Sequence, residues 1–375
     1  MDLTLDAESR AFRAEATEWL AAHTPGRLPS LDTAEGFAAH RDWERTLARH
    51  RWSVVSWPKE FGGRDASLLH WLLFEEAYYA AGAPVRVSQN GIFLLAPTLF
   101  THGTEEQRRR LLPPMASAEQ VWAQAWSEPE AGSDLAGIRS RARRTDGGWL
   151  LSGQKTWSSR AAFADRAFGL FRTDPAAERH RGLTYFLFDL RAPGVTVRPI
   201  PQLDGEPGFA EIFLDEVFVP DVDVLGAPGD GWRVAMSTSA NERGLSLRSP
   251  GRFQATARKL VELWQRREDP GLRDRVVDAW IGAQSYRLHT LATVTRLAEG
   301  GELGAESSAG KLFWSELDLD LHETALELLG AEAELDGEWS HGWLFALAGP
   351  IYAGTNEIQR TVVAERLLGL PRSPR

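Results

Sequence analysis

The run LTYFLFDL, residues 183–190, and three similar runs near it set the fold class of this chain. All four are short and rich in aromatic and β-branched residues, which favours strands. The other three are RAFGLFRT (166–173), GVTVRPI (194–200) and AEIFLDEVFV (210–219). Turn signals such as Pro193-Gly194 separate them, and no helix of useful length fits between them. We therefore expect an antiparallel sheet that forms a small barrel or sandwich.

Helical patterns lie on both sides of this β region. Before it, apolar residues recur with helical spacing from Asp6 to about Met115, and Thr104 with Gln107 forms a capping-box pattern. After it, long helical segments return, and segment 272–300 carries an apolar stripe on or near one face. The stripe consists of Leu272, Val276, Trp280, Leu288, Leu291 and Leu297.

These patterns predict an α+β protein with three domains. An N-terminal α-helical domain spans residues 1–120, and a central β domain, an antiparallel β-barrel or sandwich, spans 121–228. A C-terminal antiparallel four-helix bundle spans 229–375. With 375 residues and 43% hydrophobic content, the chain has enough apolar material for these cores.

Composition argues against several kinds of partner. The net charge of -10 at pH 7 disfavours a broad binding surface for nucleic acid or anionic membranes. No run approaches the roughly 18 apolar residues of a membrane span, and residues 1–10 lack the basic and apolar regions of a signal peptide. Without cysteine there is no disulfide, thiolate metal site or cysteine nucleophile. We expect no nucleic-acid partner, no membrane span and a cytoplasmic location.

Three familiar site motifs fail on spacing. In GAESSAGKL, residues 304–312, five residues separate the glycines and Leu312 stands where a P-loop needs Ser or Thr. HETAL at His322 lacks the second histidine of a zinc helix, and no G-x-G-x-x-G follows a strand. The nine histidines are scattered, so we expect no metal site.

Two motifs in the β region remain as candidate binding elements. WSEPEAGSDLAG, residues 126–137, is either a plain turn or a loop whose backbone N–H groups and hydroxyls, from Ser127 and Ser133, face an anionic or carbonyl-rich ligand. In LSGQKTWSS, Trp157 and Ser159 share one face of a strand. They are either a core tryptophan with a surface serine, or an aromatic plane beside a hydroxyl in a binding site.

The ordered set of motifs resembles the acyl-CoA dehydrogenase family along nearly the whole chain. Each motif is weak alone, but their order within a helix, β, helix arrangement is highly specific. The motifs are SEPEAGSDLAG, GQKTWSS, GLTYFLFD, DEVFVP, GDGWRVAM, NERG, YAGTNEIQR and AERLLGLPR.

The resemblance implies FAD as cofactor, held between the β domain and the C-terminal bundle. It places the backbone of Trp126 and Ser127 at the flavin ring, and Ser133 near both the flavin and the thioester. Trp157 is expected to pack on the isoalloxazine. Ser159, which keeps the hydroxyl of the Thr found in many relatives, is expected to hydrogen-bond near N5. A flat apolar wall with a few directed donors suits a buried flavin.

The reaction implied by the resemblance removes an α-proton from an acyl thioester while the β-hydrogen leaves as hydride. An α C–H is a very weak acid, so the site needs both a base and a donor for the developing enolate oxygen. Many relatives carry a Glu where this chain has Ala353. The isovaleryl-type and long-chain-type enzymes instead use a Glu-Arg pair, which matches Glu242-Arg243 in SANERGLS.

Glu242 is therefore the expected base, although as a bare helix residue it is also explained as a solvated carboxylate. The backbone N–H of Ala353 is expected to donate to the thioester oxygen, and Arg243 to brace the last loop. Substrate is expected to contact Ser133, Glu242, Tyr352 and Gly354. Thr355 and Glu357 are expected FAD contacts, and Thr355 is equally explained as a helix N-cap.

The chain departs from the family pattern at the expected adenine end of FAD. An Arg, aromatic, Gly stretch is missing around LWQRREDPG, and Glu327 replaces a Gln. An added negative charge near a diphosphate is unfavourable.

The expected substrate is an acyl-CoA or acyl-carrier thioester, with an electron-transfer flavoprotein as acceptor. The expected assembly is a homo-oligomer, dimer or tetramer, or a heterotetramer. The alternatives are an acyl or aminoacyl carrier-protein dehydrogenase, a flavin oxidase or monooxygenase on the same fold, and one subunit of a hetero-oligomeric acyl-CoA dehydrogenase.

Overall fold

The computed structural model describes residues 4–242, 249–301 and 303–371, without the side chains of residues 240–242. The chain forms two compact units that interleave along the sequence. The first comprises residues 1–24, 66–83 and 243–375, and the second comprises residues 25–65 and 84–242. The helices of the N-terminal third are therefore shared between the two units. Within the described residues, no helix has the length and apolar character needed to span a bilayer.

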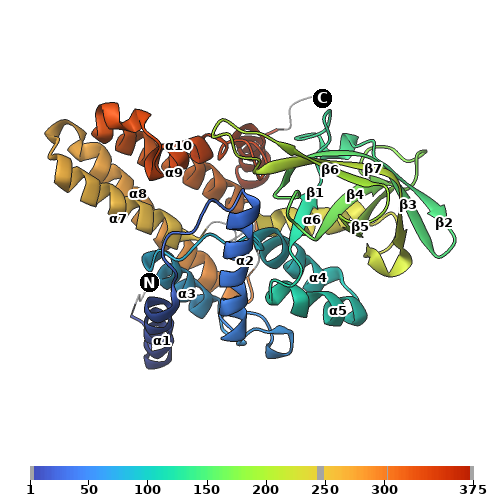
Figure 1. Cartoon of the computed structure of the whole chain (residues 1–375), viewed down its shortest axis with the longest axis horizontal. Helices are drawn as coiled ribbons and strands as arrows, with labels where there is room; N and C mark the ends of the chain where they lie inside the picture. The colour runs from blue at the N-terminus through green and yellow to red at the C-terminus, as the bar shows by residue number, and fades with distance from the viewer. Residues whose placement is uncertain (1–3, 243–248, 302, 372–375) are drawn as a thin grey trace. The chain divides into compact units, whose positions relative to one another are not determined.

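The first unit is helical (Figure 1). α7, α8 and α9 pack against one another, α10 and α11 pack on α9, and α3 packs between α1 and α7. The bounds are α1 (Ala7–His23), α3 (Leu68–Ala80), α7 (Pro250–Arg267), η5 (Pro270–Leu272), α8 (Arg273–Ala298), α9 (Glu306–Leu329), η6 (Gly330–Glu334), α10 (Glu338–Leu347), α11 (Asn356–Val362) and η7 (Val363–Leu367). Short connections between α7, α8 and α9 make neighbours antiparallel, as the bundle prediction requires.

Glycine allows α3 and α7 to approach closely. A Cβ added at Gly251, on the first turn of α7, would lie 2.7 Å from the backbone oxygen of Glu75 on α3. This contact holds an N-terminal helix against the C-terminal bundle. Buried apolar side chains of α7, α8 and α9, including Phe253, Leu260 and Leu321, fill the core of the unit.

The predicted apolar stripe on α8 is only partly correct. Val276 is buried, but Trp280 and Leu288 are exposed. The face that α8 buries also contains small and polar residues, because α7 and α9 pack close to it. Its buried residues are Val276, Ala279, Ala283, Tyr286, Thr290, Thr293 and Val294.

The second unit is built on an eight-stranded sheet with the order β6-β7-β3-β2-β4-β5-β8, and β1 pairs with β4. The strands are β1 (Trp122–Ala125), β2 (Arg141–Thr145), β3 (Gly148–Ser159), β4 (Arg166–Arg172), β5 (Leu183–Asp189), β6 (Val195–Ile200), β7 (Phe209–Pro220) and β8 (Val224–Leu225). Most pairs are antiparallel, which confirms the prediction, but β1 runs parallel to β4, and one β2–β4 pair is also parallel. β1 was not among the predicted strands.

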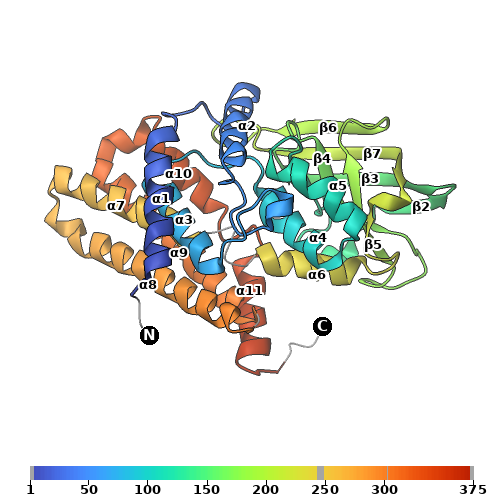
Figure 2. The same ribbon diagram turned by 90° about the horizontal axis from the view of Figure 1, so that it is seen from below.

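Helices of the second unit lie beside this sheet (Figure 2). Their bounds are α2 (Ala34–Arg49), η1 (Lys59–Phe61), η2 (Asn90–Leu95), α4 (Ala96–His102), α5 (Glu105–Ala116), η3 (Leu135–Gly137), η4 (Asp221–Asp223) and α6 (Gly231–Glu242). The predicted capping box is confirmed at α5, where Thr104 accepts from the Gln107 N–H at 3.1 Å and Gln107 accepts from the Thr104 N–H at 3.0 Å. α6 packs on β4, β5 and α4 within the second unit, and the domain boundary at residue 229 stays a prediction.

Candidate active site

The loop after β1 carries the first group of predicted site residues. Trp126 is buried and meets the ring of Tyr185 edge-on, with centroids 6.4 Å apart. The Ser127 carbonyl accepts a hydrogen bond from the Thr156 N–H at 2.9 Å, which ties the loop to β3. Ser133 is exposed further along the loop. The loop is thus bonded to the sheet at Ser127 and more exposed at Ser133.

A buried ion pair between Lys155 and Glu128 also links this loop to the sheet. The Lys155 side chain is 0% exposed, and Nζ donates to Glu128 Oε1 at 2.8 Å and to the Leu170 carbonyl at 2.7 Å. The Glu128 carboxylate also accepts the backbone N–H groups of Arg139 at 2.6 Å and Ser140 at 3.0 Å. β1, β3 and β4 are therefore joined through one ammonium group.

The pKa values of both members of the pair are lowered, but for different reasons. Desolvation lowers the pKa of Lys155 to about 8, although the neighbouring carboxylate of Glu128 opposes this. Desolvation also acts to raise the pKa of Glu128, but Lys155 and the Arg139 N–H outweigh it, so the pKa of Glu128 is lowered. Glu128 is thus held as a carboxylate.

Trp157 lies on a bulge of β3. Between the pairs Lys155–Ile212 and Ser158–Ala210, β3 has one residue more than β7, and Trp157 has a φ of 57°. A left-handed backbone is uncommon for a bulky residue. The bulge exchanges the faces of the strand: Lys155 and Ser158 are buried, whereas Trp157 is 59% exposed. The interpretation of Trp157 as a core residue is wrong, and Ser159 is half-buried beyond it.

α6 is anchored one turn before its last residue. The Thr238 hydroxyl lies 2.9 Å from that of Thr98 and 3.4 Å from the hydroxyl of Tyr185, the residue that also packs on Trp126. Glu242 ends the helix, four residues after Thr238. The Glu242 side chain and the whole of Arg243 lie outside the described residues.

The last predicted group lies in the first unit, in the turn before α11. Ala353 and Gly354 both have left-handed backbones, with φ of 57° and 79°. Tyr352 stacks on Trp314 of α9, with centroids 5.9 Å apart. Thr355 is the N-cap of α11, since its hydroxyl accepts from the Ile358 N–H at 3.3 Å. Glu357 is exposed in the first turn, where the backbone N–H and the Thr355 hydroxyl lower its pKa.

The structure thus brings the predicted residues together in two sets. Trp126, Ser127 and Trp157 lie in the second unit, where the Thr156 N–H ties the loop after β1 to β3, and Tyr352 to Glu357 share one turn in the first. At the departure from the family pattern, Glu327 of α9 forms an ion pair with Arg275 of α8. Its negative charge is therefore balanced within the helical unit.

Sequence reasoning assigned no role to the buried polar residues behind these sets. Glu128 lies in the motif WSEPEAGSDLAG and Lys155 in LSGQKTWSS. The signal for them was a charged residue at an interior position of a strand, because a buried charge needs a partner. Lys311, Asn356 and Gln359, behind the turn before α11, are buried as well.

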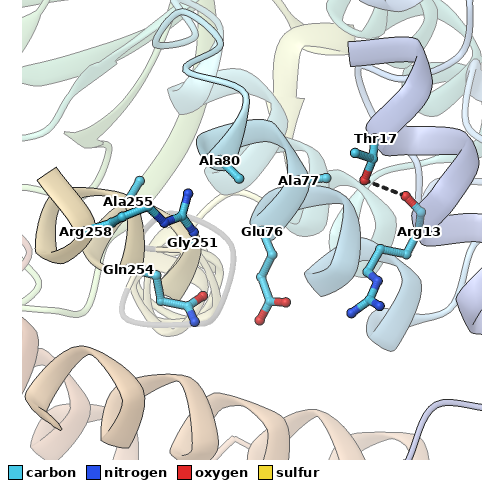
Figure 3. A pocket seen from close by; sticks show the side chains of 9 residues that line it. All are labelled: Arg13, Thr17, Glu76, Ala77, Ala80, Gly251, Gln254, Ala255 and Arg258. Atoms are coloured by element: carbon cyan, nitrogen blue, oxygen red, sulfur yellow. Dashed lines mark hydrogen bonds between the residues drawn. The ribbon is translucent and has the colours of Figure 1, made fainter. Parts of the chain in front are cut away.

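A separate pocket of about 220 Å³ lies in the first unit between α1, α3 and α7 (Figure 3). Its lining residues are Arg13, Thr17, Glu76, Ala77, Ala80, Gly251, Gln254, Ala255 and Arg258. It contains no predicted site residue, and its carboxylate, Glu76, accepts from Arg287 Nε at 2.5 Å. The pocket is therefore separate from the candidate active site.

Among the described residues no group of three or more His, Asp or Glu could hold a metal ion.

Comparison with known proteins covers nearly the whole chain. Three family models match in succession: acyl-CoA dehydrogenase, N-terminal domain, over residues 6–119; middle domain, over 123–217; and C-terminal domain, over 229–368. Acyl-CoA dehydrogenase IpdE1 of Mycobacterium tuberculosis is 40% identical over 380 residues, 96% of this chain and 97% of the relative. Acyl-CoA dehydrogenase FadE26 of the same organism is 30% identical over 405 residues, 100% of both chains.

Solved structures agree with these matches. The Tcur3481-Tcur3483 steroid ACAD has a TM-score of 0.89 and 27% identity, covering 100% of both chains. The ChsE4-ChsE5 complex from Mycobacterium tuberculosis has a TM-score of 0.86 and 28% identity, also covering 100% of both chains.

Proposed function

Because the chain belongs to the acyl-CoA dehydrogenase family, we propose that it uses FAD to oxidise an acyl thioester to the trans-2-enoyl thioester. One C–H bond breaks at the α-carbon, where the proton leaves to a base, and one at the β-carbon, where hydrogen leaves with its electron pair. Bound FAD would supply the hydride-accepting chemistry. The residues of the chain must then hold the ring, remove the proton and stabilise the enolate oxygen.

The observation that best supports FAD binding is the exposed indole of Trp157. More than half of this large apolar side chain meets solvent, on a bulge whose backbone is held by neighbouring strand pairs. A flat apolar surface at a rigid position fits an isoalloxazine ring. We assign FAD contacts to Trp126, Ser127, Ser133 and Ser159, and likewise to Thr355 and Glu357.

We assign the proton transfer to Glu242. α6 is fixed at Thr238 by two hydroxyl neighbours, so the helix end that carries Glu242 has a firm support. The backbone N–H of Ala353 is the donor to the thioester oxygen, and Arg243 braces that turn. Ser133, Tyr352 and Gly354 complete the substrate contacts.

The relatives support a CoA thioester with a bulky, ring-bearing acyl group. The ring-bearing group is proposed from the steroid ACAD, at 27% identity over the full chain, and the CoA thioester from the mycobacterial acyl-CoA dehydrogenases, at 30–40% identity over nearly the full chain. A prolyl acyl carrier protein oxidase matches at 21% identity, which shows the fold alone. We therefore place a carrier-bound substrate second. An electron-transfer flavoprotein is the proposed electron acceptor.

Anaerobic titration with acyl thioesters tests this function. We expect ring-bearing acyl-CoA thioesters to bleach the oxidised flavin band of the purified protein, and straight-chain acyl-CoA or acyl-carrier thioesters to bleach it more slowly. The reason is that substrate oxidation delivers two electrons to the flavin and, without oxygen, none leave. A protein that no thioester bleaches, or that consumes oxygen rapidly during turnover, would contradict the proposal.

A second chain of the same fold is proposed to cover the apolar face of α8. Val277, Trp280, Ile281 and Leu288 recur at helical spacing around Gln284 and are 40–55% exposed, and apolar side chains exposed together on one face favour association. We expect the purified protein to be an oligomer, and Ile281→Asp to shift it toward the 41.6 kDa monomer in light scattering. His289→Asp, also exposed on α8 but away from this face, is the control. A monomeric parent protein, or an Ile281→Asp variant of unchanged size, would rule this face out as the interface.

A further inference from the structure

We propose that Gln359 is a positioning residue: with Lys311 and Asn356 it fixes the turn before α11 so that the N–H of Ala353 stays available to the thioester oxygen. The proposal rests on the proposed function, because it adds residues to the same site. The whole network lies in the first unit and in described residues.

The turn itself is strained and incompletely bonded. Ala353 has a φ of 57°, a conformation that costs an L-residue roughly 1 kcal/mol or more. In the described part of the chain its N–H has no acceptor, although Ala353 is buried. The N–H of the preceding Tyr352 does have one, the Ala348 carbonyl at 3.1 Å. An N–H without an acceptor on a buried residue is unfavourable, and a ligand oxygen would supply that acceptor.

Gln359 holds this turn by bonding to its backbone carbonyls and leaves its N–H groups untouched. Its Nε2 donates to the Ala353 carbonyl at 3.0 Å and to the Gly354 carbonyl at 3.3 Å. The side chain is 0% exposed. A Cβ added at Gly354 would lie 2.4 Å from Nε2, so the glycine permits the amide to approach. Ala353 therefore uses its carbonyl within the protein and keeps its N–H unused.

Lys311 and Asn356 hold the helix that carries Gln359. Lys311 Nζ, buried on α9, donates to Asn356 Oδ1 at 2.6 Å, and the Ser315 hydroxyl donates to the same oxygen at 3.2 Å. The Asn356 N–H donates to the Pro350 carbonyl at 2.8 Å. The start of α11 is thus bonded both to α9 and to the beginning of the turn. Gln359 follows one turn later on the same short helix.

A fixed donor matters because the charge on the thioester oxygen grows as the α-proton leaves. A donor already in place needs no reorganisation at that moment, and the loss of one such donor typically slows catalysis about 100-fold or more. If the turn loosens but the N–H donor remains, part of the stabilisation of the thioester oxygen is kept. We therefore expect Gln359→Met, which keeps the side-chain length and removes the amide donor, to slow flavin reduction at saturating substrate roughly tenfold to 100-fold.

The test uses the FAD-loaded protein and a 3-thiaacyl-CoA, whose acidic α-position is deprotonated in a competent site to give a long-wavelength charge-transfer band. In Gln359→Met we expect a weaker band, a lower kcat, a KM within about threefold of the parent value and unchanged FAD content. Asn356→Ala should show the same pattern to a smaller extent, and it serves if Gln359→Met does not fold. Thr361→Ala, exposed on the same helix, is the control.

The outcomes separate this inference from the proposed function. A parent protein that forms no charge-transfer band and is not bleached by any thioester would overturn both. A parent with a strong band and variants with unchanged band and rate would overturn only the role of Gln359. Variants in which FAD content and melting temperature fall in proportion to activity would show a purely structural role. That result would also overturn the positioning role of Gln359.

Discussion

Replacing Glu242 with glutamine should slow anaerobic flavin reduction by about 100-fold or more while the protein keeps its yellow FAD. Glutamine has nearly the same shape but cannot accept the α-proton, and an α C–H does not ionise at a useful rate without a base. Stopped-flow reduction with a ring-bearing acyl-CoA measures the effect directly. The bound flavin spectrum shows whether the cofactor site is intact.

The matched control is another carboxylate next to the same helix. Asp230 precedes α6 and pairs with Arg233 at 2.7 Å, so Asp230→Asn also removes one negative charge near this helix. It should reduce at close to the parent rate. If Glu242→Gln reduced as fast as the control, Glu242 would be removed from the mechanism. The base would then have to be sought in another carboxylate.

The order of helices and strands was readable because local patterns decide it. The capping box at Thr104 and the alternation of buried and exposed residues in β7 require only neighbours in sequence. The pairing of β1 with β4 was not readable, since it joins segments more than 40 residues apart. Nothing in the local pattern of Trp122–Ala125 specifies a parallel neighbour.

The interleaving of the two units has the same kind of cause. α1 and α3 pack with the C-terminal helices because of contacts such as Gly251 against Glu75, which depend on backbone approach across the chain. The exposed Trp280 and Leu288 of α8 illustrate the limit of an apolar stripe. An apolar pattern predicts a face that packs away from water, but it does not show that this chain covers that face.

The candidate site was readable to the extent that motifs carry it. Trp157 and Ser127 were predicted from motifs, but the bulge that turns Trp157 outward depends on β7, so the strand pattern left its exposure open. The supporting residues were harder still. A buried lysine such as Lys155 becomes recognisable only when its carboxylate partner, 27 residues away, is seen beside it.

Replacing Lys155 with methionine should lower the free energy of unfolding by about 3–5 kcal/mol, because it leaves the Glu128 carboxylate buried without its ammonium partner. Methionine fills much of the same space, so the cavity contribution is small. The loop at Ser127 and the bulge at Trp157 should loosen together. Lys155 precedes the bulge on β3, and its ammonium group bonds to Glu128 in the loop. Denaturant unfolding of the FAD-free protein measures the first effect, and FAD dissociation the second.

The double variant Lys155→Met/Glu128→Gln separates the effect of the unpaired charge from the effect of changed side-chain packing. With the stranded charge removed, it should regain part of the lost stability, because much of the cost of breaking a buried pair lies in the unpaired ion. Arg143→Met, which breaks an exposed pair with Glu216 on the same sheet, should have little measurable effect. If Lys155→Met were no more destabilising than Arg143→Met, the buried pair would not support the loop. FAD affinity equal to that of the parent protein would separate the pair from the cofactor site.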